Sequence, residues 1–404
     1  MRFFVTTSKG LEPALVEELE ELGFEDRALA PGGVHVRGSE ADLVKLNVRL
    51  ATALRVLIPL RAGLAEDGDE LYDLAAGIDW PRWIEPDGAL WVRVSGRGGP
   101  GLSHTGFVAQ RVKDAVVDSL RSATGERPSV DRNRPDLALV VHLDEDSVRI
   151  ALDSSGESLH RRGYRTDPGE AALRETIAAA VLRLAGWRPE RRLIDLTCGS
   201  GTVVIEAARR RLGLAPGGER DFVFPRWPDA ADKGWTEAAI RSEREAARAS
   251  ALDGPPLLGF DMSAEAIATA RDNARRAGVD AIVRFEARRL EDMPELELGE
   301  PGDLLFSNPP WGDRLGEVEE LRGLYGALGD VFKSRGAGWT GAILTGQTKL
   351  GKSVGLRTKR RIPLWTGSTE CRLLLYELYR GSRKPGRSDR NGSDGGDKVG
   401  ADPA

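Results

Sequence analysis

The sequence predicts an α/β protein in which an N-terminal α+β region precedes a mostly parallel, doubly wound sheet. Up to about residue 155, β-rich runs and amphipathic helical stretches follow one another without a recognisable catalytic motif. From Arg191 onwards, short apolar runs alternate with helical stretches. Strands that alternate with helices in this way are typical of parallel sheets with helices on both faces.

The elements of the N-terminal region follow from two periodicities. Apolar residues three and four apart predict helices, and alternating apolar residues predict strands. Gly23 and Gly125 follow two of the helical stretches and are natural C-terminal caps. The predicted helices are 11–22, 41–57 and 107–123, and the predicted strands are 2–7, 34–37, 89–95, 137–143 and 147–152.

The second half carries the strands of the predicted parallel sheet, at 193–197, 257–261, 281–285, 303–307 and 342–345. Residues 213–233 combine Gly, Pro and Trp without periodicity and predict a loop-rich insertion. Residues 381–404 contain no aromatic residue, so they bury too little apolar surface to offset the entropy of ordering. We expect this tail to be disordered.

Composition excludes several classes of protein. No run of about 18 apolar residues occurs, and residues 1–9 lack the features of a signal peptide, so we expect no membrane span. With two cysteines, Cys198 and Cys371, and four scattered histidines, we expect a reducing cytoplasm and no metal site. The net charge of −5 argues against a protein that coats nucleic acid through bulk charge, but permits a local basic track.

A glycine loop, Asp195-Leu-Thr-Cys-Gly-Ser-Gly-Thr202, lies between a predicted strand and a predicted helix. Gly199 and Gly201 let the backbone approach a ligand closely. A dinucleotide site would want a third glycine near Val204 and no carboxylate nearby, whereas here Asp195 ends the strand. A carboxylate favours the ammonium and sulfonium groups of S-adenosylmethionine. The simpler alternative is a tight turn in which Asp195 caps the helix.

A second loop, Asn308-Pro309-Pro310-Trp311, follows another apolar strand, so we expect it at the same edge of the sheet. The two prolines stiffen it and leave carbonyl oxygens as acceptors. The Asn308 side-chain oxygen and the Pro309 carbonyl would hold an aromatic amine and favour its developing positive charge, while Trp311 would stack on the extruded base. The simpler alternative is a stiff surface loop with a buried tryptophan.

These two loops resemble those of class I methyltransferases that modify exocyclic amines. Together with further matching segments, they resemble, over nearly the whole chain, the THUMP-containing bacterial 23S rRNA guanine-N2 methyltransferases; the segments are Leu11-Glu12, 160–165, 173–176 and Pro363-Leu364. The resemblance implies a ferredoxin-like segment at 1–65, a THUMP RNA-binding domain at 66–155 and a Rossmann-like class I methyltransferase domain at 156–380, before the tail at 381–404.

The resemblance also implies roles for individual residues. Those expected to line the S-adenosylmethionine site are Asp195, Cys198, Gly199 and Gly201 at the methionine end, and Asp261 and Met262 at the ribose and adenine. Two positions depart from the family pattern. Arg288-Arg289 stands where relatives often place an acid that contacts adenine, which leaves Glu291 or Asp292 as substitutes. Trp311 replaces the usual tyrosine or phenylalanine.

A local basic track is expected to contact RNA phosphates. Its candidates lie just before the methyltransferase domain and in a stretch free of acidic residues: Arg161, Arg162, Arg165, Lys349 and Lys352. A solvated charged face explains any one of them equally well. We expect an RNA guanine-N2 methyltransferase acting on rRNA. The alternatives are a tRNA enzyme of the same architecture, an adenine-N6 enzyme, or a non-catalytic ribosome-assembly factor.

Overall fold

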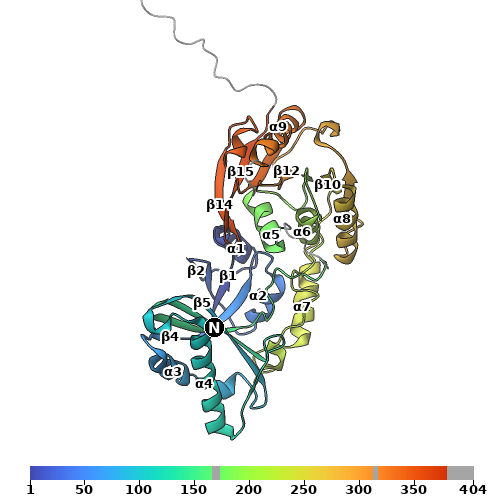
Figure 1. Cartoon of the computed structure of the whole chain (residues 1–404). Helices are drawn as coiled ribbons and strands as arrows, with labels where there is room; N and C mark the ends of the chain where they lie inside the picture. Colours follow the sequence, from blue (N-terminus) through green and yellow to red (C-terminus); the bar gives the residue numbers. More distant parts are fainter. Residues whose placement is uncertain (166–172, 313–316, 380–404) are drawn as a thin grey trace, which may run out of the picture.

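The computed structural model describes residues 1–165, 173–312 and 317–379, and the tail predicted to be disordered lies outside these residues. The chain forms two lobes, each built on one sheet (Figure 1). No helix within the described ranges has the length and apolar character needed to cross a membrane. The predicted fold class is confirmed, because an α+β lobe precedes a mostly parallel, doubly wound one.

The sheet of the N-terminal lobe has eight strands in the order β2-β3-β1-β4-β8-β7-β5-β6. Their bounds are β1 Arg2–Thr6, β2 Arg27–Ala30, β3 Gly33–Arg37, β4 Arg55–Leu64, β5 Ala89–Gly98, β6 Ser129–Val130, β7 Leu137–Glu145 and β8 Ser147–Asp153. In β4, Leu57 pairs with Phe4 of β1 on one side and with Asp153 of β8 on the other. The predicted ferredoxin-like and THUMP segments therefore share one sheet, and the boundary between them stays a prediction.

Four helices pack against one face of this sheet: α1 Glu12–Glu21, α2 Asp42–Arg49, α3 Gly68–Ala76 and α4 Thr105–Thr124. They bury every second residue of the strands in one core, as Val5, Val56, Ile150 and Val92 show. The predicted helix at 41–57 is wrong beyond Arg49, because residues from Arg55 onwards form β4. Pairing on both sides of this strand buries Val56 and Ile58, and β-branched side chains suit that pleated surface.

The sheet of the second lobe has seven strands in the order β11-β10-β9-β12-β13-β15-β14. Their bounds are β9 Leu193–Asp195, β10 Leu257–Asp261, β11 Val283–Ala287, β12 Leu304–Ser307, β13 Thr340–Thr345, β14 Arg360–Thr366 and β15 Thr369–Glu377. The first five are parallel and overlap the five predicted strands, whereas the antiparallel hairpin of β14 and β15 was not predicted.

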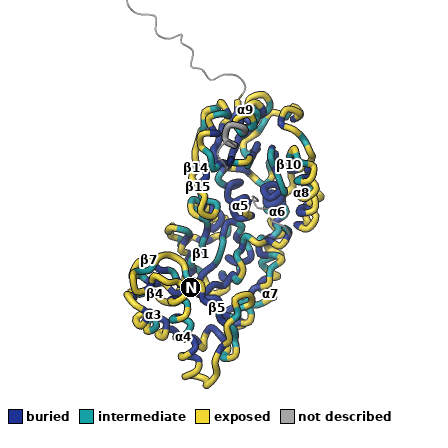
Figure 2. The backbone as a smooth tube through the Cα atoms, in the orientation of Figure 1, coloured by how far each residue is buried: buried dark blue, intermediate teal, exposed yellow. Residues whose placement is uncertain are grey.

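Helices cover both faces of the second sheet. Leu304 and Phe306 of β12 point into a core shared with α5 (Glu175–Leu184), α6 (Thr202–Arg211) and α8 (Ala264–Arg276). Leu305, between them, points into a second core with α9 (Glu317–Arg335). Helices α5 and α6 are the most deeply buried of the lobe (Figure 2). This layering is that of a doubly wound fold.

The predicted insertion is loop-rich, with one short 3-10 helix at Phe224–Arg226, and it returns the chain to the N-terminal lobe. Phe222, Phe224 and Trp227 are buried in the core of that lobe. Lys233, which is 7% exposed, places its ammonium 5.3 Å from the Trp83 ring and 4.8 Å from the Trp235 ring. The following helix, α7 (Glu237–Arg248), lies beside the lower lobe and packs on α2 (Figure 1). Buried aromatic side chains therefore anchor this part of the second half to the first.

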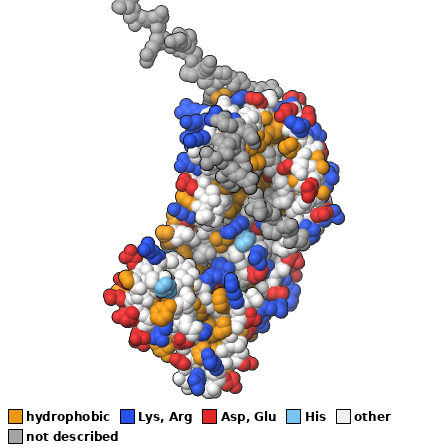
Figure 3. Space-filling view, in the orientation of Figure 1, with side chains coloured by type: hydrophobic (Ala, Val, Ile, Leu, Met, Phe, Trp, Pro, Cys, Tyr) orange, Lys and Arg blue, Asp and Glu red, His pale blue; other side chains and the backbone are white. Residues whose placement is uncertain are grey.

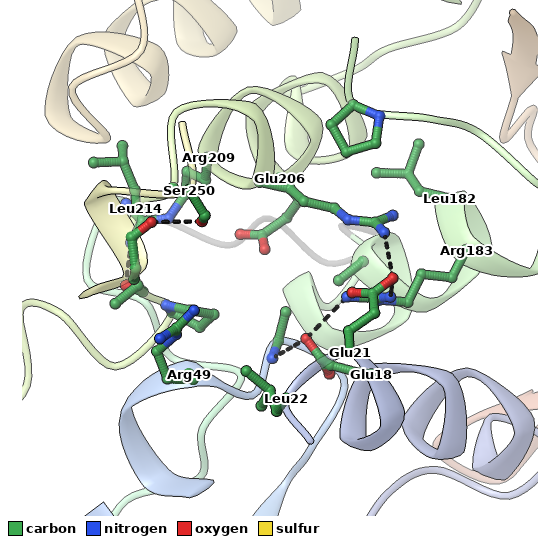
Figure 4. A pocket seen from close by; sticks show the side chains of 18 of the residues that line it. Glu18, Glu21, Leu22, Arg49, Leu182, Arg183, Glu206, Arg209, Leu214 and Ser250 are labelled. Carbon is green, nitrogen blue, oxygen red and sulfur yellow. Dashed lines mark hydrogen bonds and ion pairs between the residues drawn. The ribbon is translucent and has the colours of Figure 1, made fainter. Parts of the chain in front are cut away.

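The two lobes meet around Arg183 of α5, whose side chain is 5% exposed. Its guanidinium lies 2.8 Å from a Glu21 oxygen, 3.3 Å from one of Glu17 and 3.5 Å from one of Glu18, all on α1. A cavity of about 350 Å³ opens beside these residues (Figure 4). It lies between α1 and the helices α5 and α6. Arg183 therefore couples the N-terminal lobe to the helix that precedes the glycine loop.

We expect Arg183→Ala to destabilise the protein by about 3 kcal/mol or more, because removing one member of a buried ion pair leaves the other charges uncompensated. Thermal unfolding followed by circular dichroism measures the change. The matched control is Arg275→Ala, whose partner Asp272 lies three residues away on an exposed face of α8. That surface pair contributes about 0.5 kcal/mol or less. Equal melting temperatures for the two variants would contradict the proposed role of Arg183.

Candidate active site

Strand β9 brings the two predicted loops together, because it lies between β10 and β12. Asp195, at its end, pairs in register with Gly259 of β10 and with Phe306 of β12. All three strands are parallel, so Asp195 and Asp261, which end their strands, and Asn308, which follows β12, lie at the same edge of the sheet. This edge is where open α/β sheets bind ligands.

The glycine loop owes its shape to two glycines with different surroundings. Both have positive φ angles, 51° at Gly199 and 84° at Gly201. A Cβ atom at Gly201 would lie 2.8 Å from the Phe285 ring and 3.0 Å from Ala270. A Cβ atom at Gly199 would meet nothing within 4 Å. Gly201 therefore permits close packing of the loop on the sheet, and Gly199 leaves backbone open to a ligand.

Two carboxylates flank this loop and differ in their environment. Asp261 accepts hydrogen bonds from the amides of Gly199 and Ser263, each at 3.0 Å, so it ties the loop to the start of α8. Asp195 is 2% exposed and accepts one from the Thr197 amide at 3.1 Å. Burial raises the pKa of Asp195 to about 8; the Thr197 amide opposes this rise and the charge of Asp261 adds to it. A cation bound here would stabilise the ionised form of Asp195.

The remaining predicted cofactor residues, Cys198 and Met262, lie next to the end of β10 and differ in exposure. Cys198 is buried, and its amide donates to the Phe260 carbonyl at 2.8 Å. Burial raises the pKa of its thiol well above the ordinary value, so the thiol stays protonated. Met262 is 73% exposed and directly follows Asp261. Cys198 thus fixes the loop from within, and Met262 presents an apolar side chain at the rim.

Asn308 carries an unusual feature for a loop residue. Its side-chain oxygen is buried, yet it has no hydrogen-bond partner among the described residues. The position just before it is fixed, because the Ser307 hydroxyl bonds the Thr197 hydroxyl at 2.8 Å and so links the two loops. Buried acceptors without a partner are costly and rare in folded proteins. The Asn308 oxygen is therefore free to accept from a ligand.

The proline loop is supported by residues that were not predicted from the sequence, among them Tyr325 and Thr345. The Tyr325 hydroxyl of α9 bonds Thr345 at 2.8 Å and donates to the Pro310 carbonyl at 3.4 Å. Trp311 is half-buried, with its indole nitrogen donating to the Leu344 carbonyl at 3.3 Å. A Cβ atom at Gly346 would lie 2.7 Å from the indole. The protein thus already contacts one part of Trp311, and its stacking on a base stays a prediction. In the sequence, these supports could have been found from Thr345 and Gly346, which stand at and directly after the end of the apolar strand β13.

Two of the predicted phosphate contacts are wrong, because both side chains are buried in ion pairs. Arg162 is 2% exposed, donates to the Ala51 carbonyl at 2.5 Å and lies 3.7 Å from Glu206. The Arg165 side chain is 7% exposed and bonds Glu175 at 2.9 Å. Each arginine joins the segment between the lobes to a glutamate of α5 or α6. They therefore position the segment rather than face solvent.

The other predicted phosphate contacts are accessible. Arg161 is exposed and pairs with Glu157 at 3.1 Å. Lys349 and Lys352 are exposed in the turn that follows β13. Their contact with RNA stays a prediction.

Family models match three successive parts of the chain. Residues 2–57 match an RlmL ferredoxin-like domain, residues 65–153 a THUMP domain, and residues 162–374 an RMKL-like methyltransferase domain. The last match covers more than half of the chain and includes both loops of the site.

Individual relatives match over nearly the whole chain. A ribosomal RNA large subunit methyltransferase K/L of Syntrophotalea carbinolica is 40% identical over 94% of this chain, which spans only 54% of that relative. A Synechocystis protein named as a candidate RNA methyltransferase, slr0064, is 37% identical over 93% of this chain and 97% of its own.

A solved structure has the same fold. SMU.472, a candidate methyltransferase crystallised with S-adenosylhomocysteine, is 28% identical and superposes with a TM-score of 0.81, covering 94% of this chain and 99% of its own. The domain matches and the full-length relative agree on one assignment. The chain therefore belongs to the family of THUMP-containing proteins with an RMKL-like methyltransferase domain.

Proposed function

We propose that this protein is an RNA methyltransferase that uses S-adenosylmethionine to form N2-methylguanosine in 23S rRNA. The observation that carries the proposal is the buried, unpartnered side-chain oxygen of Asn308 at the sheet edge where the glycine loop and Asp195 also lie. An acceptor without a donor suits a substrate that brings an N–H group. An exocyclic amine is such a substrate.

The residues around the glycine loop fit S-adenosylmethionine. Asp195 offers a carboxylate that gains from a cation, and Gly199 offers accessible backbone. Asp261 and Met262 lie where the ribose and adenine would extend along the edge of the sheet. When bound there, S-adenosylmethionine supplies an activated methyl group.

The chain's own part in the reaction is to hold the amine. The nitrogen lone pair of guanine N2 is delocalised into the base and is a poor nucleophile. Two acceptors, the Asn308 side-chain oxygen and the Pro309 carbonyl, would bind its two hydrogens and favour the positive charge that develops on nitrogen. The stiff proline loop, braced by Tyr325, fixes these acceptors before the substrate arrives. Because the methylated amine is acidic, its proton needs no dedicated base.

The proposed target follows from the names of the relatives, which are large-subunit rRNA methyltransferases. We also propose a reducing cytoplasm as the location, since both cysteines are buried and free. The test is methylation of unmodified 23S rRNA and of total tRNA by the purified protein, followed by mass spectrometry of the nucleosides. N2-methylguanosine in 23S rRNA is the expected product. N2-methylguanosine in tRNA alone, N6-methyladenosine, or no product each contradicts the proposal.

We expect Asn308→Ala to lower kcat for methyl transfer by about 100-fold or more, because one acceptor for the developing charge is lost. Binding of S-adenosylmethionine, measured by calorimetry, should stay within about threefold of wild type, since Asn308 contacts the base. Asn133→Ala, at an exposed position of the N-terminal lobe, is the matched control and should leave both quantities unchanged. Normal kcat in Asn308→Ala would remove this residue from the mechanism.

We expect the affinity for S-adenosylmethionine to rise between pH 6 and pH 8 and to level off above pH 8. Asp195 has a pKa of about 8 in the free protein, and a cationic ligand binds its ionised form, so binding below that pH must first remove a proton. The expected slope is about tenfold per pH unit. Calorimetric titrations across this range give the measurement.

The variant Asp195→Asn serves as the control for this pH dependence. It should bind weakly and without the slope. It should also melt higher than wild type at pH 8, because a raised carboxyl pKa means that stability is lost as the pH rises above the ordinary value of 3.8. A slope that persists in Asp195→Asn would assign the proton to another group.

A further inference from the structure

The eight-stranded sheet of the N-terminal lobe has a second face, opposite helices α1 to α4. Alternate residues of its strands point there, in register across the sheet: Phe4 pairs with His35 and with Leu57, and Val140 pairs with Arg93. Side chains at its margins are exposed or half-buried, whereas most of those on the helix side are buried. We call this surface the open face; it consists of Arg2, Phe4, His35, Arg37, Arg55, Leu57, Pro59, Trp91, Arg93, Ser95, Arg97, Ala138, Val140, His142, Asp144, Arg149, Ala151 and Asp153.

Flat rings lie at both ends of the open face. On β1 and β3, the rings of Phe4 and His35 lie 4.7 Å apart, with Phe4 half-buried and His35 exposed. On β5, Trp91 is half-buried and has the guanidinium of Arg132 at 5.7 Å from its ring. Between them runs an apolar strip that includes Leu57, Val140 and Ala151. Aromatic rings on an open sheet are surfaces on which unpaired bases stack.

The charge of the open face has the opposite sign to that of the whole chain. The face carries six arginines, of which Arg37 is 59% exposed, Arg93 44% and Arg149 57%. Its two acids are Asp153, which is buried, and Asp144 at the rim of β7, whereas the chain as a whole has a net charge of −5. Such a concentration of arginines in an acidic protein favours a polyanionic ligand.

We propose that the open face binds single-stranded RNA, with bases stacked on Phe4 and Trp91 and the phosphates held by the arginines around them. The proposal rests on the proposed function in one respect, that the ligand is the RNA to be methylated. It specifies what the family match to a THUMP domain does not, namely the strand state of the RNA and the side chains that contact it. Duplex RNA hides its base faces and offers no ring for these side chains to stack on.

The open face continues towards the catalytic lobe. Arg55 and Arg93 both pair with Asp153 at the end of β8. Arg220 follows, donating to the carbonyls of Ser155 at 3.2 Å and Arg161 at 2.8 Å. In Figure 3, Lys and Arg side chains gather where the two lobes meet.

Beyond Arg220, further arginines lie near the start of α5. The pKa of His160 is lowered to about 4 by burial and by the charges of Arg174, Arg161, Arg162 and Arg165. Arg174 is exposed and lies directly before α5. The first residue of α5, Glu175, binds Arg165, which also contacts Thr202 at the end of the glycine loop. A strand that leaves the open face over the exposed Arg161 and Arg174 would lead towards the proposed catalytic edge.

The test is binding of a fluorescent single-stranded RNA of about 12 nucleotides to the full-length protein, measured by anisotropy without cofactor. We expect Trp91→Ala to weaken binding by roughly fivefold or more, because stacking on an aromatic ring is lost. Trp91→Phe should stay within about threefold of wild type. Equal melting temperatures of the two variants would show that the difference in affinity does not come from lost packing.

A second variant tests the charges without touching the core. Arg37→Glu with Arg97→Glu, both at exposed positions, should weaken binding and reduce its dependence on salt. Arg248→Glu with Arg275→Glu, exposed on α7 and α8, is the matched control and should bind as wild type. Wild-type affinity in both Trp91→Ala and the Arg37/Arg97 variant would overturn the proposal. The proposal would also be overturned if a blunt RNA duplex displaced the labelled strand as well as an unlabelled single strand does. The same holds if only a protein partner displaced it.

The two proposals fail in different ways. Binding to the open face is measured without methyl transfer, so an inactive wild-type protein would contradict the proposed function and leave this inference standing. Conversely, the Trp91 variant should raise KM for RNA and leave kcat within about twofold of wild type. A fall in kcat at saturating RNA with unchanged KM would contradict a binding role.

Discussion

The parallel pairing of β9 with β10 on one side and β12 on the other is the constraint on which the site depends. Register fixes Asp195 beside Gly259 and Phe306, and the next residues of each strand must then leave the sheet at one edge. The hydroxyl pair of Thr197 and Ser307 and the contact of Asp261 with the Gly199 amide join the three strand ends into one unit. A register shift of one residue in β10 or β12 would move each side chain of that strand to the other face of the sheet, and the site would be lost.

This edge carries two groups that cost the folded protein stability. Asp195 is buried with a pKa raised to about 8, and the Asn308 oxygen is buried without a donor. Glu18, by contrast, is buried and satisfied, because it accepts hydrogen bonds from Thr52 and pairs with Arg183. Two such groups at one sheet edge are typical of a functional site, where a ligand supplies the missing partner. A cationic cofactor and an amine substrate are complementary to these two groups.

The two lobes are held together by contacts that also shape the route to the site. Leu11, directly before α1, and Ala14 of α1 are part of the core of the second lobe, and the Trp365 amide donates to the Lys9 carbonyl at 3.0 Å. Conversely, Phe224 and Trp227 of the insertion in the second half of the chain pack into the core of the first lobe. Each lobe thus contributes side chains to the other's core, which favours a fixed relation between the open face and the catalytic edge.

The sequence by itself determined the elements whose signal is local. The glycine loop, the Asn-Pro-Pro turn and the five parallel strands are each set by neighbouring residues: glycines allow positive φ, prolines fix φ, and short apolar runs are buried as strands. Their order along the chain then placed both loops at one edge. The resemblance of the same motifs to a known family pointed to the domain order that the family models match.

Only the tertiary structure decided which polar side chains face solvent. Arg161, Arg162 and Arg165 look alike in sequence, yet the second and third are buried against Glu206 and Glu175, residues more than nine positions away. The end of the predicted helix at 41–57, the support of Pro310 by Tyr325 and the open face likewise depend on distant partners. A local pattern specifies what a residue can do. Burial and pairing, which decide what it does, are set by segments that meet only in the folded chain.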